Sequence, residues 1–154
     1  MKTCTLLLLL ENNDILLAMK KRGFGEGRWN GVGGKVEADE TIEQALVREC
    51  QEEIEVTPLT YHKVAIHDFK FPDGSSDMLV HTYICTKWSG EPVETDEMAP
   101  RWFNVADIPY DTMWQYDRYW FPQVLAGKKL HTKFTFDGED NMLSFDIEEV
   151  EKIA

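Results

Sequence analysis

The stretch that decides the fold is GRWNGVGGKVEADETIEQALVRECQEE, residues 27–53. Four of its first eight residues are glycines, and acidic side chains crowd the remainder. Apolar side chains recur in its second half at the spacing of an amphipathic helix, at Ile42, Ala45, Leu46 and Cys50. The stretch therefore predicts a glycine-rich loop over residues 20–34 and a helix over residues 41–53.

The predicted helix has a suitable beginning. Acidic side chains between residues 37 and 43 suit the positive end of the helix dipole. Either Thr41 or Asp39 can cap the first turn, since both side chains accept hydrogen bonds from free backbone N–H groups. Pro58 follows soon after the end and discourages further helix.

The acidic side chains at the end of this helix form a pattern of their own. Glu49, Glu52 and Glu53 are spaced so that they project from adjacent turns. Each like-charge pair costs roughly 0.2–0.5 kcal/mol, a cost that a divalent cation between the carboxylates removes. Oxygen ligands favour Mg²⁺, Mn²⁺ or Ca²⁺ over zinc. A solvated acidic face is the alternative for an isolated Glu-x-x-Glu-Glu, but Arg48 and the glycine loop favour a cation site.

Composition restricts the classes of function. The 154 residues, 43% of them hydrophobic, predict one domain over residues 1–154 with one core. With 28 acidic and 16 basic residues the net charge is −12, which disfavours binding to polymeric nucleic acid.

The cysteines and the leucine run bear on location. Cys4, Cys50 and Cys85 are too widely spaced for a disulfide framework or a zinc cage, which indicates a reducing compartment. The leucines of residues 6–10 are too few to cross a membrane, and no cleavage site follows them. We therefore expect a cytoplasmic protein with no membrane partner.

The rest of the chain is mostly β. Alternating or continuous apolar runs predict strands at residues 4–10, 15–19, 60–71, 78–86, 101–104, 133–138 and 143–147. The first two and the last two are expected to form hairpins, and the first strand to be buried on both faces. A second helix is predicted over residues 117–125, where Pro122 fits only near the beginning or at a kink.

The glycine loop and helix together carry a longer pattern. Gly34 is followed after five residues by Glu40 and after seven more by Arg48-Glu49-Cys50-Gln51-Glu52-Glu53. This pattern resembles the signature of the Nudix hydrolases, which cleave nucleoside diphosphates linked to another group. Glu55 stands where that family usually has glycine, with the expected aliphatic Val56 after it. If the position needs a positive φ, Glu55 costs of order 1 kcal/mol.

The resemblance implies roles for the acidic helix. Glu49, Glu52 and Glu53 would bind Mg²⁺, with Mn²⁺ as a possible substitute and the carbonyl of Gly34 as a further ligand. Arg48 would orient a neighbouring glutamate. Such ions neutralise phosphate oxygens and lower the pKa of an attacking water.

The general base has two candidates. Glu53 lies on the metal face, and Glu97, in the loop Glu94-Thr95-Asp96-Glu97, can approach from the opposite side. We favour Glu53. The reaction implied is water displacing a phosphoanhydride oxygen.

The resemblance extends to a subfamily. MKKRGFGEGRWNG, GEPVETDEM and MW..D.YWFP are similar to stretches of the oxidised purine nucleoside triphosphatases, the MutT-type 8-oxo-dGTP diphosphatases. This implies the Nudix α/β/α sandwich, a mixed β-sheet between helices, and hydrolysis of a nucleoside triphosphate such as 8-oxo-dGTP to the monophosphate and pyrophosphate. The alternatives are a different nucleoside diphosphate derivative as substrate, or a non-catalytic nucleotide-sensing module.

A purine site needs a flat apolar slot and a few polar groups. The subfamily resemblance places Asn30, Trp114 and Asp117 there, with Trp114 stacked on the base. The candidate walls are Phe24, Phe69, Phe71 and Met78. Tyr116 stands where the subfamily usually has a second aspartate, so the choice among oxidised purines is expected to differ.

Other polar and aromatic residues receive simpler interpretations. Lys20, with Lys21 and Arg22, forms the only dense basic cluster and suits a phosphate-rich ligand. Trp120 and Phe121 are assigned to the core. No histidine is assigned to chemistry; His67 and His81 are expected to be strand residues with hydrogen-bond partners.

Overall fold

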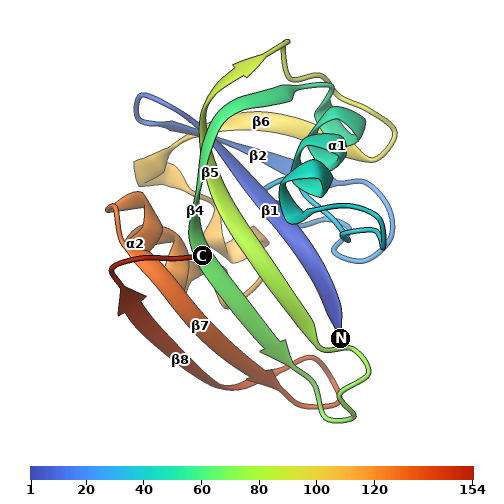
Figure 1. Cartoon of the computed structure of the whole chain (residues 1–154), viewed down its shortest axis with the longest axis vertical. Coiled ribbons are helices and arrows are strands. Elements are labelled where there is room, and N and C mark those ends of the chain that lie inside the picture. The colour runs from blue at the N-terminus through green and yellow to red at the C-terminus, as the bar shows by residue number, and fades with distance from the viewer.

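The computed structural model describes all 154 residues and is built around one eight-stranded mixed sheet (Figure 1). The strands are β1 (Lys2–Glu11), β2 (Asp14–Lys20), β3 (Trp29–Asn30), β4 (Thr57–Lys70), β5 (Met78–Ser89), β6 (Met98–Asn104), β7 (Lys129–Phe136) and β8 (Met142–Val150). The helices are α1 (Ile42–Ile54) and α2 (Asp117–Leu125), with short 3₁₀ turns at Val105–Asp107 and Tyr110–Thr112. None of the helices is long and apolar enough to cross a membrane.

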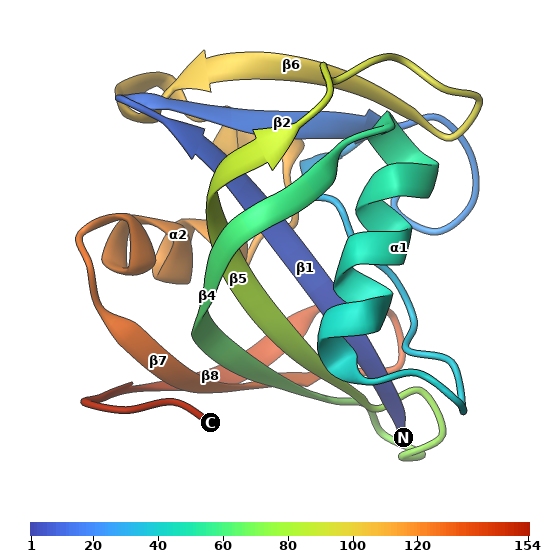
Figure 2. The same ribbon diagram turned by 45° about the horizontal axis from the view of Figure 1, so that its top comes forward.

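The strand order is β3-β2-β1-β5-β4-β7-β8, and β6 pairs with β2. β1 runs parallel to β5 and β4 runs parallel to β7, whereas the other pairs are antiparallel. The two helices cover opposite faces of the sheet (Figure 2). This arrangement confirms the predicted α/β/α sandwich and both predicted hairpins.

The central sheet divides the apolar side chains into two clusters, where the sequence predicted one core. Successive side chains of a strand point to opposite faces, so Leu8 packs with Trp120 and Phe121 of α2. Leu7 and Leu9 pack on the other side. That second cluster contains Leu46, Cys50 and Ile54 of α1. The first strand is therefore buried on both faces, as its unbroken apolar run predicted, and Trp120 and Phe121 are core residues as expected.

The beginning of α1 settles the choice of cap. The Thr41 hydroxyl accepts a hydrogen bond from the Gln44 N–H at 3.1 Å, and the Gln44 side chain accepts one from the Thr41 N–H at 2.9 Å. This reciprocal pair satisfies two backbone donors that a helix leaves free. Thr41, and not Asp39, is the cap.

The glycine-rich stretch differs from the prediction of a loop over residues 20–34. Trp29 and Asn30 pair with β2, and Val32 and Lys35 form isolated bridges to β1. Glycines interrupt the side-chain alternation that marks a strand in sequence, because they present no side chain to either face. The backbone of this stretch is therefore extended along β1 and β2 for part of its length.

The second helix has the predicted limits, but Pro122 lies in its interior and not near its beginning. A proline there lacks the N–H that would reach back to the preceding turn. The helix buries Trp120, Phe121 and Val124 against the sheet. This burial offsets the missing hydrogen bond.

The end of α1 yields a stability prediction. Glu55 has φ +60° and ψ +36°, and its N–H donates to the Gln51 carbonyl at 3.0 Å. Glu55 therefore has the positive φ under which a backbone cost is expected from the sequence. We expect Glu55→Gly to raise the free energy of unfolding by about 1 kcal/mol, because glycine adopts this conformation without strain.

Urea denaturation measures this difference, and Glu55→Ala is the matched control because it removes the carboxylate but keeps a Cβ. Equal stabilisation by alanine and glycine would show that charge, and not backbone conformation, is responsible.

Candidate active site

The glycine loop lies wedged between β1 and α1. A Cβ on Gly33 would fall 1.9 Å from the Thr5 carbonyl oxygen, and a Cβ on Gly34 would fall 2.5 Å from the carboxyl carbon of Glu49. The Gly34 carbonyl accepts the Thr5 N–H at 2.9 Å and, over a longer distance, the Thr5 hydroxyl at 3.5 Å. Glycine is required at Gly33 because a side chain would collide with the backbone of β1, whereas a side chain at Gly34 would displace the Glu49 carboxylate.

Glu53 is the most enclosed of the helix carboxylates, with 1% of its surface exposed. Its Oε1 accepts the N–H of Gly33 at 3.1 Å, while its Oε2 is buried without a partner. Burial and the neighbouring charge of Glu49 raise the pKa of Glu53, against the lowering effects of the Gly33 N–H and the charge of Lys20. The site therefore holds a carboxylate with one free acceptor.

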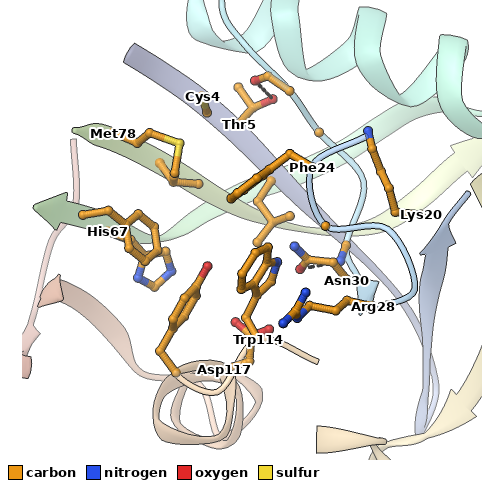
Figure 3. A pocket seen from close by; sticks show the side chains of 18 of the residues that line it. Cys4, Thr5, Lys20, Phe24, Arg28, Asn30, His67, Met78, Trp114 and Asp117 are labelled. Atoms are coloured by element: carbon orange, nitrogen blue, oxygen red, sulfur yellow. Dashed lines mark hydrogen bonds between the residues drawn. The ribbon is translucent and has the colours of Figure 1, made fainter. Parts of the chain in front are cut away.

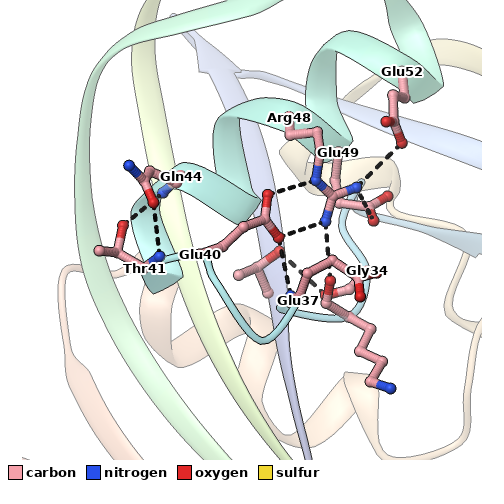
Figure 4. Close-up of polar contacts among 10 residues, drawn as sticks. Gly34, Glu37, Glu40, Thr41, Gln44, Arg48, Glu49 and Glu52 are labelled. Carbon is pink, nitrogen blue, oxygen red and sulfur yellow. Dashed lines mark hydrogen bonds and ion pairs between the residues drawn. The ribbon is translucent and has the colours of Figure 1, made fainter.

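Arg48 holds the other carboxylates (Figure 4). Its Nε and Nη2 donate to the two oxygens of Glu40 at 2.6 and 2.9 Å, and its Nη1 donates to Glu49 at 2.9 Å and Glu52 at 3.2 Å. The bidentate pair lowers the pKa of Glu40 to about 2. The planar guanidinium thus fixes Glu49 beside Glu53.

The three glutamates of the helix face do not point the same way. Glu53 turns inward, whereas Glu52 is bonded to Arg48 with 57% of its side chain exposed. No three His, Cys, Asp or Glu side chains lie close enough together to enclose a cation. Glu49 and the free Oε2 of Glu53 nevertheless fit a hard divalent ion, since such an ion takes oxygen ligands and offsets their mutual repulsion.

The loop carrying Glu97 is attached to the end of α1. The Thr95 hydroxyl donates to the Glu53 carbonyl at 2.8 Å, and the Glu97 carbonyl accepts the Lys21 N–H at 2.9 Å. Lys21 also pairs with Glu94. Glu97 itself is half-buried and directly precedes β6.

A cavity of about 220 Å³ opens beside the acidic helix (Figure 3). It brings together eight of the nine residues predicted to bind substrate: Lys20, Phe24, Asn30, Phe69, Met78, Trp114, Tyr116 and Asp117. Phe71 lines an adjoining cavity of about 490 Å³ that shares Trp114 and Tyr116 with the first. Of the basic cluster, Lys20 alone faces the cavity.

Trp114 lies at the centre of an aromatic group. The Phe24 ring stacks on it at 5.0 Å between centroids, and the Arg28 guanidinium carbon lies 4.2 Å from its ring centroid. Tyr116 is almost parallel to it at 6.1 Å. Sequence reasoning missed Arg28, whose only signal was its place in the glycine-rich stretch.

The polar groups of the cavity are few. Asp117 is buried and accepts the Trp120 indole N–H at 3.1 Å through Oδ1, while its Oδ2 has no partner. Burial raises the pKa of Asp117 to about 8. Asn30 accepts the Gly31 N–H at 2.8 Å, which leaves its amide N–H₂ group available.

His67 also lines the cavity, although the sequence assigned it no role. Its Nδ1 lies 2.7 Å from the Thr132 hydroxyl, so the expected partner exists. His81 differs from its prediction, since its Nδ1 is buried without a partner. No pattern along the chain distinguishes His67 from an ordinary strand residue, because its partner is 65 positions away.

Comparison with known proteins agrees with this geometry. The model of the NUDIX domain matches residues 2–124. The chain belongs to the Nudix hydrolase family. Enzymes of this family generally use a divalent metal ion, which suits the carboxylate pair on α1.

Relatives of this Nudix hydrolase match nearly its full length. It is 44% identical to the oxidized purine nucleoside triphosphate hydrolase of Danio rerio, over 99% of this chain and 97% of that protein. It is also 44% identical to the protein of the same name from Mus musculus, over 96% of this chain and 94% of the relative. The crystal structure of a MutT protein from Bacillus halodurans has a TM-score of 0.85 and 25% identity, with 96% of this chain and 98% of that one covered.

The buried Asp117 gives a pH prediction. Between about pH 4 and pH 8 its carboxyl is protonated in the folded protein and ionised in the unfolded chain, so unfolding releases a proton. Rising pH therefore destabilises the parent. We expect Asp117→Asn, which stays neutral, to gain about 1 kcal/mol of unfolding free energy relative to the parent per pH unit.

Urea titrations across this pH range measure the difference. Asp137→Asn is the control, because hydrogen bonds lower the pKa of Asp137 and its carboxylate is ionised in both states above about pH 5. A pH-independent difference for Asp117→Asn would contradict the assignment of a protonated carboxyl.

Proposed function

We propose that this Nudix hydrolase is a Mg²⁺-dependent nucleoside triphosphate pyrophosphohydrolase that converts oxidised purine nucleotides such as 8-oxo-dGTP to the monophosphate and pyrophosphate. The observation that carries the proposal is the position of Lys20. It lines the aromatic cavity, and its charge lowers the pKa of Glu53 on the acidic helix. A nucleotide whose base enters the cavity would then have its phosphates beside Lys20 and directed toward the carboxylates. The names of the relatives support the same substrate class.

The phosphate end uses the acidic helix. Glu49 and Glu53 would hold the ion, joined by Glu52 and by the Gly34 carbonyl, which would exchange its long contact with the Thr5 hydroxyl for the ion. When bound, Mg²⁺, or Mn²⁺ in its place, would neutralise phosphate oxygens and lower the pKa of the attacking water. Arg48 keeps Glu49 and Glu52 in place, because its Nη1 donates a hydrogen bond to each.

Glu53 is also the favoured general base. Its unpartnered Oε2 can accept the proton of the attacking water, and its raised pKa suits a base that works near neutral pH. Glu97 is the alternative, because Thr95 attaches its loop to the Glu53 carbonyl.

The base end uses the aromatic cavity. A purine that stacks on Trp114 replaces one of the contacts now made by Phe24 or Arg28. Phe24 is 70% exposed, so moving it uncovers little new apolar surface. Asn30 and Asp117 then face the purine edge with an amide N–H₂ group and an unpartnered carboxyl oxygen. Both groups can donate a hydrogen bond, and Asp117 can also accept one when ionised.

One alternative is a different nucleotide as substrate, since Tyr116 beside Asp117 changes the polar groups of the cavity. The other is a non-catalytic sensor. The unpartnered buried oxygen of Glu53 argues against a sensor, because an unused carboxylate there destabilises the fold without benefit.

Pyrophosphate release from a panel of normal and oxidised nucleoside triphosphates with Mg²⁺ tests the proposal. We expect 8-oxo-dGTP to give the highest kcat/KM in the panel. Equal rates for all nucleotides would contradict the substrate, and no release from any would contradict the reaction.

Glu53→Gln should lower kcat by roughly 10² or more, because it removes an ionic ligand or the base. Its melting temperature should hold or rise, since burial and Glu49 disfavour a charge on Glu53 and glutamine is neutral. Glu43→Gln, in the first turn of the same helix and exposed, is the matched control and should keep parent activity. Parent-like turnover of Glu53→Gln at saturating Mg²⁺ would remove Glu53 from the mechanism.

The cavity edge should control substrate choice. Asp117→Asn replaces a carboxyl that exchanges a proton with a fixed amide, so a hydrogen-bonded purine should lose about 1–3 kcal/mol of transition-state binding. The loss should be larger for 8-oxo-dGTP than for poorly recognised nucleotides. Tyr116→Asp should shift the preference among oxidised purines by adding a second carboxyl. If Asp117→Asn lowers kcat/KM by the same factor for every nucleotide, Asp117 supports the fold and does not recognise the base.

A further inference from the structure

His67, like Asp117, is a cavity residue that has a buried hydrogen-bonding atom without a partner. It lies on β4, is 1% exposed, and lines the same cavity as Asp117 (Figure 3). Its Nε2 is buried and has no partner. A buried polar atom without a partner destabilises the fold, and His67, unlike His81, lines the cavity, so a ligand in the cavity can supply the missing bond.

His67 and Asp117 belong to one packed group. The His67 ring centroid lies 4.3 Å from that of Trp120, and the Trp120 indole N–H donates to Asp117 at 3.1 Å. Trp120 is 1% exposed, so it cannot move without disturbing the core. The sheet and α2 therefore hold both polar side chains rigidly at the same cavity.

Thr132 gives the imidazole two possible roles. Burial lowers the pKa of His67 to about 3, so the ring is neutral. A neutral ring has one N–H and one acceptor nitrogen, and the Thr132 hydroxyl 2.7 Å from Nδ1 can either donate or accept. Nε2 is an acceptor when Nδ1 donates to Thr132, and a donor when Nδ1 accepts. It can therefore match a purine edge of either kind.

The Tyr116 side chain lies beside Asp117 in the sequence but contributes its ring to the cavity wall. Its ring packs against Phe69 at 4.9 Å, Phe134 at 5.2 Å and Phe136 at 5.7 Å, so it belongs to the aromatic wall. It forms no side-chain hydrogen bond with Asp117. His67 on β4 can supply a polar contact to a base from a different element than Asp117.

We propose that His67 is a specificity-determining residue whose Nε2 hydrogen-bonds to the edge of the bound purine, with Thr132 setting its tautomer. The inference rests on the proposed function for the identity of the ligand as a purine nucleotide. His67 belongs to the sheet and Asp117 to α2, so the base would receive hydrogen bonds from two different elements.

Kinetics with His67→Leu tests the contact, because leucine fills similar space without nitrogen. We expect the ratio of kcat/KM for 8-oxo-dGTP over dATP to fall roughly 10-fold, with a melting temperature at or above that of the parent. Thr132→Val, which removes only the hydroxyl, should lower the same ratio in the same direction. His62→Leu, on the exposed side of β4, is the control and should leave the ratio unchanged. Equal losses for both nucleotides in His67→Leu would overturn the proposal.

Binding of the product separates this inference from the proposed function. Protein with ¹⁵N-labelled histidine is titrated with 8-oxo-dGMP without metal, and the Nε2 resonance of His67, assigned with His67→Leu, should shift while that of His62 stays in place. A shift of the His67 resonance without any hydrolysis by the parent would support the base contact and contradict the proposed reaction. Hydrolysis of 8-oxo-dGTP with an unmoved His67 resonance would support the reaction and overturn the contact. A His67 resonance that responds to no nucleotide would also overturn the contact.

Discussion

The hydrogen bond from the Gly33 N–H to Glu53 is the contact on which the site depends. It requires the loop backbone to reach the carboxylate, and Gly33 is held against the Thr5 carbonyl so closely that no Cβ fits. The same approach places Gly34 against Glu49. Strand, loop and helix are thereby locked in one register, and the acidic face of α1 opens next to the cavity. The glycines are thus needed where the loop backbone contacts the carboxylates of α1.

Electrostatics around this contact are divided between two cations. Arg48 binds the outer carboxylates through charge-assisted hydrogen bonds, which limits repulsion along the helix. Lys20 acts on Glu53 from the cavity side. Between these positive groups, Glu53 keeps one oxygen unpaired. A net charge of −12 over the chain is therefore compatible with an anionic substrate, because the charges that the substrate meets are arranged locally.

Sequence periodicity predicted α1, α2 and most strands, because the buried apolar side chains of a helix or strand recur at a characteristic spacing. It failed for β3, where glycines hide the alternation, and it could not reveal that the sheet separates Leu8 from Leu7 and Leu9. The family resemblance located the aromatic cavity. It gave no indication of His67, since the contact with Thr132 joins neighbouring parallel strands far apart in the chain.

The division of the interior by the sheet bears on how such a protein diversifies. Glu49 and Glu53 belong to α1 on one face, whereas Asp117 is presented by α2 on the other. Substitutions at separated sites combine nearly independently. Residues around the base can therefore drift toward a new ligand while the hydrolytic apparatus stays intact. A substitution at Tyr116, which packs in the aromatic wall, would then alter the choice of nucleotide without altering the residues of α1.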